Sequence, residues 1–184
     1  MKEPYQRYVH TLTRSRLFQI DAVGLRFSNG TEVEFERLSP GHDGGAVLVV
    51  PITEHGELLM IREYAVGTER YELGFPKGRL EVDESPGTGA RRELREETGY
   101  DAHRIDELRR VTLAPGYIAH ETTIILARQL THAPLRGDEP EPPELIGWPL
   151  NRFDELLNQQ GLTEARSIAA LYLAQTFLDA TTGD

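Results

Sequence analysis

The chain has 184 residues, with 30 acidic side chains against 20 basic ones, a net charge of −10 and no cysteine. Without cysteine it has neither disulfides nor thiolate metal sites, and its negative charge disfavours nucleic acid, which binds basic patches. No apolar run approaches the roughly 18 residues of a membrane span and the N-terminus has no signal-peptide core, so we expect a cytoplasmic protein without a membrane partner.

The first 40 residues alternate apolar and polar side chains around a turn. Residues 17–27 and 31–38 both show the period of a half-exposed strand. Ser28-Asn29-Gly30 lies between them and is a hairpin turn signal. We therefore expect residues 1–40 to form an antiparallel β ribbon and residues 41–184 to form a second domain, with the boundary in the loop at residues 39–45.

The second domain is predicted to hold a sheet. Its first segment, residues 46–52, is rich in β-branched residues and has the pattern of a buried central strand, with residues 58–64 as its partner. Further strands are expected at residues 69–75, 108–113, 122–130 and 146–150.

Three helices are predicted around this sheet. Ser85 as N-cap and Pro86 after it begin the first, and Gly99 ends it. Asn151 and Thr163 are expected to begin two later helices. The last helix carries apolar residues at helical spacing and should pack on the sheet, through Ile168, Leu171, Tyr172, Phe177 and Leu178. The fold class is therefore α/β, with a mixed sheet and a small β appendage.

The first predicted helix carries three carboxylates on one face. Glu93, Glu96 and Glu97 are spaced at i, i+3 and i+4, so they are neighbours and repel by roughly 0.2–0.5 kcal/mol per pair. A divalent cation with oxygen ligands removes that repulsion, and Mg²⁺ shares its remaining positions with substrate phosphates. The alternative is a solvated face with ion pairs, which is the commoner meaning of a charge run.

The glycines and charges around these carboxylates keep a fixed spacing. Gly78, Glu84, Arg92-Glu93-Leu94, Glu96-Glu97 and Gly99-Tyr100 together resemble a complete Nudix box. The resemblance implies an α/β/α sandwich and hydrolysis of a nucleoside diphosphate linked to another group, with Mg²⁺ or Mn²⁺.

The resemblance also implies roles for single residues. Glu93 and Glu97 would bind metal directly, and Glu96 would bind it directly or through water. The carbonyl of Lys77 would be a further ligand, and Arg92 would orient Glu93. Glu84 would brace the loop, and Gly78 and Gly99 would be structural.

Residues 61–75 are candidates for contact with the substrate. Arg62 and Arg70 could hold pyrophosphate through bidentate guanidinium contacts, and Glu72 is grouped with them as substrate-binding. The aromatic residues of this segment could stack on adenine or pack in the core; they are Tyr64, Tyr71 and Phe75.

Two further segments bear on substrate and catalysis. Pro115 resembles a residue of ADP-ribose pyrophosphatases and Tyr117 one of diadenosine polyphosphate hydrolases, while Pro115-Gly116 also fits a plain turn. In the acidic loop at residues 137–144, Glu139 and Glu141 are candidates for a general base or an extra metal ligand, or else for solvated surface.

Several segments together resemble bacterial Nudix enzymes that act on ADP-linked compounds, over nearly the whole chain. They are residues 13–18, 62–68, 71–75, 137–142 and 148–150. The implied substrates are ADP-ribose, diadenosine polyphosphates and NADH, cleaved to give AMP, and the implied partner is a second copy of the chain joined through the ribbon. Two other functions stay open: a nucleotide sensor of the same fold that no longer cleaves, and a hydrolase of nucleoside triphosphates or capped RNA.

Overall fold

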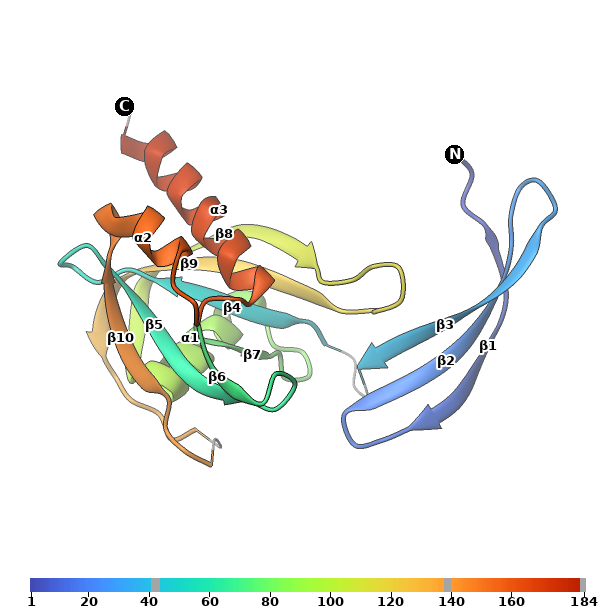
Figure 1. Ribbon diagram of the computed structural model, residues 1–184, viewed down its shortest axis with the longest axis horizontal. Coiled ribbons are helices and arrows are strands. Elements are labelled where there is room, and N and C mark those ends of the chain that lie inside the picture. The colour runs from blue at the N-terminus through green and yellow to red at the C-terminus, as the bar shows by residue number, and fades with distance from the viewer. Residues whose placement is uncertain (41–43, 138–139, 183–184) are drawn as a thin grey trace. The chain divides into compact units, whose positions relative to one another are not determined.

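The computed structural model describes residues 1–40, 44–137 and 140–182. The chain divides into two compact units. The first consists of Met1–Gly44 with Thr112–Glu121, and the second of Gly45–Val111 with Thr122–Asp184. Figure 1 follows the chain by colour from the blue ribbon of the first unit to the red C-terminal helix of the second. In the described part of the chain, no helix is long and apolar enough to cross a membrane.

The first unit contains the expected antiparallel ribbon, with one strand more than the sequence pattern predicts. β2 (Phe18–Arg26) lies between β1 (Tyr5–Arg14) and β3 (Glu32–Pro40), and both neighbours run antiparallel to it (Figure 1). The sequence pattern does not predict β1, because its ten residues are almost all exposed and therefore show no alternation of apolar and polar side chains.

A buried carboxylate joins the three strands of the ribbon. Asp21 of β2 accepts hydrogen bonds from Thr11 at 3.1 Å, Gln19 at 2.8 Å, Arg37 at 3.1 Å and Ser39 at 3.2 Å. These donors, first of all Gln19, hold the pKa of Asp21 below its usual value. Because an unsatisfied buried carboxylate is costly, this network fixes the register of β1 and β3 on β2.

The second unit contains two sheets. In the mixed sheet, β4 is parallel to β9 and antiparallel to β7. Its order is β7 (Lys77–Arg79), β4 (Ala46–Pro51), β9 (Glu121–His132) and β8 (Tyr100–Thr112). The other sheet is antiparallel, in the order β10 (Glu144–Pro149), β5 (Glu57–Ala65) and β6 (Arg70–Gly74).

The predicted pairing of residues 46–52 with residues 58–64 is wrong. Residues 46–52 and residues 58–64 share only the isolated bridge between Ile52 and Leu58. Both edges of β4 already bond β7 and β9, so β5 pairs with β6 and β10 instead.

Helices cover both faces of the buried strand β4. Val47 and Val49 pack in one cluster with Ala90 and Leu94 of α1 (Pro86–Thr98). Leu48 and Val50 pack in the other cluster with residues of α3 (Ala165–Thr182), such as Leu171. Because successive side chains of a strand point to opposite faces, α1 and α3 lie on opposite sides of the sheet (Figure 1). The expected α/β/α sandwich is confirmed.

The ends of α1 are those that the sequence predicts. The Ser85 hydroxyl accepts a hydrogen bond from the Thr88 N–H at 3.2 Å, and Pro86 is the first helical residue. Gly99 ends the helix in the left-handed region, with φ of 79°, and its N–H donates to the Arg95 carbonyl. This geometry needs glycine, because a Cβ disfavours positive φ.

The later helices begin at other residues than predicted. Asn151 lies inside the short 3-10 helix η1 (Leu150–Arg152), which precedes α2 (Phe153–Leu157). The hydroxyl of Thr163 donates to Glu72 at 2.9 Å, so it does not cap α3. Glu164 takes that place, because its carboxylate accepts the N–H and the hydroxyl of Ser167, both at 2.8 Å.

Replacing Glu164 by Gln is expected to lower the free energy of unfolding by about 1 kcal/mol at pH 7. Burial raises the pKa of Glu164, but Arg166 and Ser167 outweigh it and hold the pKa below the ordinary 4.5. A carboxyl with a depressed folded-state pKa stabilises the fold above its unfolded pKa and loses this contribution as the pH falls. Urea unfolding of wild type and variant should therefore differ at pH 7 and converge only at a pH below the depressed folded-state pKa of Glu164.

Exposed Glu54 provides the control for this experiment, since its side chain is 87% exposed. Glu54→Gln should leave the unfolding curve unchanged at both pH values. A Glu164→Gln variant as stable as wild type at pH 7 would show that the carboxylate does not stabilise the start of α3.

Candidate active site

The carboxylates of α1 differ in burial. Glu93 and Glu97 are each only 7% exposed, and Glu96 is half-buried. Both buried glutamates lie on the side of the helix that faces the sheet, beside Leu94. A charged side chain at such a position needs compensating partners. The carboxylate face of α1 is therefore not the solvated helix face of the alternative interpretation.

Gly78 lies directly against the carboxylate of Glu93. A Cβ added to Gly78 would lie 2.0 Å from the carboxyl carbon and from Oε1 of Glu93. No other residue therefore fits at position 78 without moving the Glu93 head group. The bare backbone of β7 forms one wall for this carboxylate.

Arg92 holds three glutamates at once. Its Nη1 donates to Glu93 Oε1 at 2.8 Å and to Glu96 Oε2 at 3.0 Å. Its Nε and Nη2 donate to the two oxygens of Glu84 at 3.0 and 2.9 Å, and Nη2 also reaches the Arg79 carbonyl at 2.8 Å. These bonds hold the pKa of Glu84 below its usual range and raise that of Arg92. Arg92 and Glu84 thus lie where an orienting cation and a loop brace are expected.

Glu97 is a buried carboxylate next to the strand that precedes the loop. Its Oε2 accepts the backbone N–H of Lys77 at 2.9 Å. Burial raises the pKa of Glu97 to about 8, although the charge of Lys77 and this hydrogen bond act in the opposite direction. Burial therefore favours the neutral acid form of this carboxyl group.

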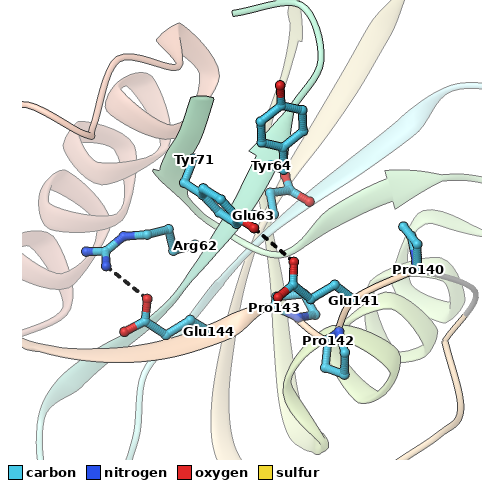
Figure 2. Close-up of a pocket in the computed structure, with 9 residues that line it drawn as sticks. All are labelled: Arg62, Glu63, Tyr64, Tyr71, Pro140, Glu141, Pro142, Pro143 and Glu144. Atoms are coloured by element: carbon cyan, nitrogen blue, oxygen red, sulfur yellow. Dashed lines mark hydrogen bonds and ion pairs between the residues drawn. The ribbon is translucent and has the colours of Figure 1, made fainter. Parts of the chain in front are cut away.

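A cavity of about 340 Å³ lies over β5, β6 and the acidic loop (Figure 2). Its lining residues are Arg62, Glu63, Tyr64, Tyr71 and residues 140–144. The rings of Tyr64 and Tyr71 are about half exposed and meet edge to face, with centroids 5.5 Å apart. Phe75 is fully buried. The two tyrosines therefore offer ring faces to a ligand, whereas Phe75 belongs to the core.

Two contacts fix the acidic loop to this cavity. The Tyr71 hydroxyl donates to Glu141 Oε2 at 2.9 Å, which raises the pKa of Tyr71 (Figure 2). Arg62 Nη1 donates to Glu144 Oε2, also at 2.9 Å. Glu141 is therefore held at the cavity, while Glu139 lies outside the described residues.

Four other residues predicted to bind substrate are not among those that line this cavity. Arg70 donates to Glu72 at 2.8 Å and to Thr163 at 3.1 Å, and neither Arg70 nor Glu72 lines the cavity. Pro115 and Tyr117 belong to the first unit. There they line an apolar pocket of about 370 Å³ together with ribbon residues such as Val23, Leu25 and Phe35. The substrate roles of all four stay predictions.

Sequence reasoning does not single out Glu63 or the side chain of Lys77. The ammonium of Lys77 forms an ion pair with Glu63, one of the residues that line the cavity. Glu63 lies within the segment already marked as a substrate candidate, but a lone glutamate on a strand matches no motif. Only the pairing with Lys77, fourteen positions away, reveals it.

Comparison with known proteins places the chain in one family. The NUDIX domain model matches residues 42–172, and that of the NudE-type Nudix hydrolase N-terminal domain matches residues 7–37. ADP compounds hydrolase NudE of Escherichia coli (strain K12) is 42% identical over 178 residues, which cover 97% of this chain and 95% of that protein.

Two further comparisons agree. ADP-ribose pyrophosphatase of Bacillus subtilis (strain 168) is 29% identical over 133 residues, covering 71% of this chain and 72% of that protein. A crystal structure of an ADP compounds hydrolase superposes with a TM-score of 0.91 at 41% identity, covering 98% of this chain and 97% of that one. The spacing from Gly78 to Gly99, the sandwich that positions it and these relatives lead to one conclusion: the chain belongs to the Nudix hydrolase family.

Proposed function

We propose that this chain hydrolyses the pyrophosphate bond of compounds in which ADP is linked to a second group, and that it releases AMP. The candidate substrates are ADP-ribose, diadenosine polyphosphates and NADH. The names of two relatives, an ADP compounds hydrolase and an ADP-ribose pyrophosphatase, support this substrate class. The observation that carries the proposal is the position of Lys77, which contacts Glu97 through its backbone and Glu63 in the cavity wall through its side chain. We therefore treat the carboxylate helix and the cavity as adjoining parts of one site.

Family membership implies a divalent cation, and the residue types at α1 fit one. Among the described residues, no three His, Asp or Glu side chains are already gathered around a metal position. Arg92 bonds both Glu93 and Glu96. The donors are nevertheless hard oxygens of the kind that Mg²⁺ and Mn²⁺ prefer. Glu97 is a buried carboxyl group with a raised pKa, which is the environment that an adjacent cation relieves.

We assign Glu93, Glu96, Glu97 and the Lys77 carbonyl as the groups that would hold the cation, with magnesium preferred to manganese. When bound, it lowers the pKa of a coordinated water and neutralises charge that develops on the phosphoryl oxygens. Arg92 keeps the heads of Glu93 and Glu96 in place, and Gly78 leaves room for Glu93. In the cavity, Arg62 offers a guanidinium for phosphate, and Tyr64 and Tyr71 offer faces for adenine.

Glu141 is our candidate for the general base. We expect Glu141→Gln to lower kcat by about 100-fold or more, within the usual range for loss of a general base, and to change KM little. Steady-state kinetics with ADP-ribose and Mg²⁺ provide the measurement. Glu139→Gln is the matched comparison in the same loop, and a large loss in that variant alone would transfer the assignment to Glu139. Full activity in both would place the base outside this loop.

A substrate panel tests the reaction itself. The protein is incubated with Mg²⁺ and ADP-ribose, diadenosine polyphosphates, NADH, nucleoside triphosphates or capped RNA, in ¹⁸O-labelled water. We expect AMP from the ADP-linked compounds, and the position of the label identifies the phosphorus that is attacked. Preference for triphosphates or capped RNA would favour the other hydrolase class, and tight binding without turnover of any compound would favour a sensor.

We propose that the chain acts in the cytoplasm as a homodimer, without nucleic-acid or membrane partners. Support for the dimer comes from the edge strand β1, which leaves Tyr5 and Leu12 exposed, because an open apolar edge of a sheet is a site for pairing with another chain. Sedimentation equilibrium of the full chain and of a Leu12→Glu variant tests this proposal. A monomeric wild-type protein at micromolar concentration would contradict it.

A further inference from the structure

Lys77 connects the carboxylate helix with the cavity. It is the first residue of β7, where its Cα pairs with that of Leu48 in β4, so its backbone is fixed in the mixed sheet. Its N–H donates to Glu97 Oε2 at 2.9 Å. Its ammonium pairs in turn with Glu63 Oε1, on β5 of the other sheet. The positive charge therefore lies between the two sheets, at the side of the buried carboxylates.

The ion pair of Lys77 and Glu63 is partly open to solvent. The Lys77 side chain is 21% exposed and that of Glu63 is 31% exposed. Glu63 is one of the residues that line the cavity, together with Arg62, Tyr64 and Tyr71 (Figure 2). A ligand in this cavity can thus approach the pair.

Arg92, the cation beside the carboxylates of α1, already uses its donors. The guanidinium of Arg92 is shared among Glu84, Glu93, Glu96 and the Arg79 carbonyl. In contrast, the only acceptor for the Lys77 ammonium among the residues that the structure describes is Glu63. An ammonium has three N–H donors, so two remain for oxygen atoms of a ligand.

We propose that the ammonium of Lys77 binds a nonbridging oxygen of the substrate pyrophosphate, and that Glu63 is the positioning residue that holds it there. This inference rests on the proposed function, and it adds a specificity group that the Nudix spacing does not contain. Lysine suits the task because its ammonium is a compact charge whose donors rotate freely. A cation fixed near the reacting phosphoryl groups also stabilises negative charge as it develops.

The pair distinguishes pyrophosphate from monophosphate. A pyrophosphate whose one end lies against the carboxylate helix extends its second phosphoryl group toward the cavity, where Lys77 can reach it. A single phosphate cannot occupy both positions. After cleavage, Glu63 still neutralises the ammonium, so release of the product does not leave an unpaired, half-buried charge.

The test uses Lys77→Met, Lys77→Arg and the double variant Glu63→Gln/Lys77→Met of the full chain. Calorimetry measures binding of inorganic pyrophosphate and of inorganic phosphate with Mg²⁺, and kinetics with ADP-ribose give kcat and KM. We expect Lys77→Met to weaken pyrophosphate binding and kcat/KM by about 10- to 100-fold, as for a lost charged hydrogen bond, and to leave phosphate binding nearly unchanged. Lys77→Arg should keep most of both.

The double variant separates a binding role from a structural one. It removes both members of the ion pair, so it should unfold at the wild-type temperature and still bind pyrophosphate as weakly as Lys77→Met. Recovery of pyrophosphate binding in the double variant would overturn the proposal, as would wild-type binding by Lys77→Met. The binding of pyrophosphate is measured without turnover. A wild-type protein that fails to cleave ADP-ribose would therefore refute the proposed function, while the comparison of pyrophosphate binding between wild type and the Lys77 variants would still test the role of Lys77.

Discussion

Replacing Glu93 or Glu97 by Gln is expected to lower turnover of ADP-ribose by at least about 1,000-fold, which corresponds to roughly 4 kcal/mol of transition-state stabilisation. Glutamine keeps the size of the side chain but supplies a neutral amide, which binds hard cations poorly. The fold should persist, because burial already favours the uncharged form of Glu97. The measurement is kcat at saturating Mg²⁺, with circular dichroism and thermal unfolding of each variant.

Glu54→Gln again serves as the control, since Glu54 lies on an exposed turn away from α1. It makes the same chemical change without touching the carboxylate face. Folded Glu93→Gln and Glu97→Gln proteins that turn over at nearly the wild-type rate would refute the assignment of these glutamates as the metal-binding groups.

Adding a methyl group at position 78, by replacing Gly78 with Ala, is expected to lower turnover about 100-fold. A loss of this size is typical when a catalytic group is displaced by about 1 Å. In Gly78→Ala the new Cβ would overlap the Glu93 carboxylate, which must move away from the backbone of β7. Its bond to Arg92 would be lost or displaced at the same time. Kinetics should show the loss mainly in kcat, together with a higher Mg²⁺ requirement.

Gly87, which lies in α1, gives a matched control for the same chemical change. A Cβ at Gly87 meets nothing within 4 Å, and the residue lies in the first turn of α1. Gly87→Ala should retain full activity and gain a little stability, because alanine is favoured over glycine in a helix. Equal activity of Gly78→Ala and Gly87→Ala would mean that the position of Glu93 does not matter for turnover.

The parts of this fold that the sequence predicts are those with local causes. Ser85, Pro86 and Gly99 fix the ends of α1 through contacts within a few residues, so both ends are correct. The partner of β4 is wrong because strand pairing is decided by distant segments: β9 begins some seventy residues later and takes the edge that β5 would need. Strand β1 is missed for a different reason, since it buries almost nothing.

The candidate site divides in the same way. Its carboxylate face follows from helical spacing and from the family pattern around it. The cavity does not, because it forms where β5, β6 and a loop seventy residues further on converge. Because both residues are arginines in the same segment, the residue type does not tell which of the two faces a ligand. Arg62 lines the cavity, whereas Arg70 is bound to Glu72 and Thr163.

The hydrogen bonds of Arg92 have a consequence for which ions the protein can accept. Three carboxylates, those of Glu84, Glu93 and Glu96, share one guanidinium, which leaves two negative charges when all three are ionised. One divalent ion offsets both remaining charges of these four side chains, whereas one sodium or potassium ion of the surrounding electrolyte offsets only one of them. Selection against the abundant monovalent ions can therefore begin with electroneutrality, before coordination geometry has any effect.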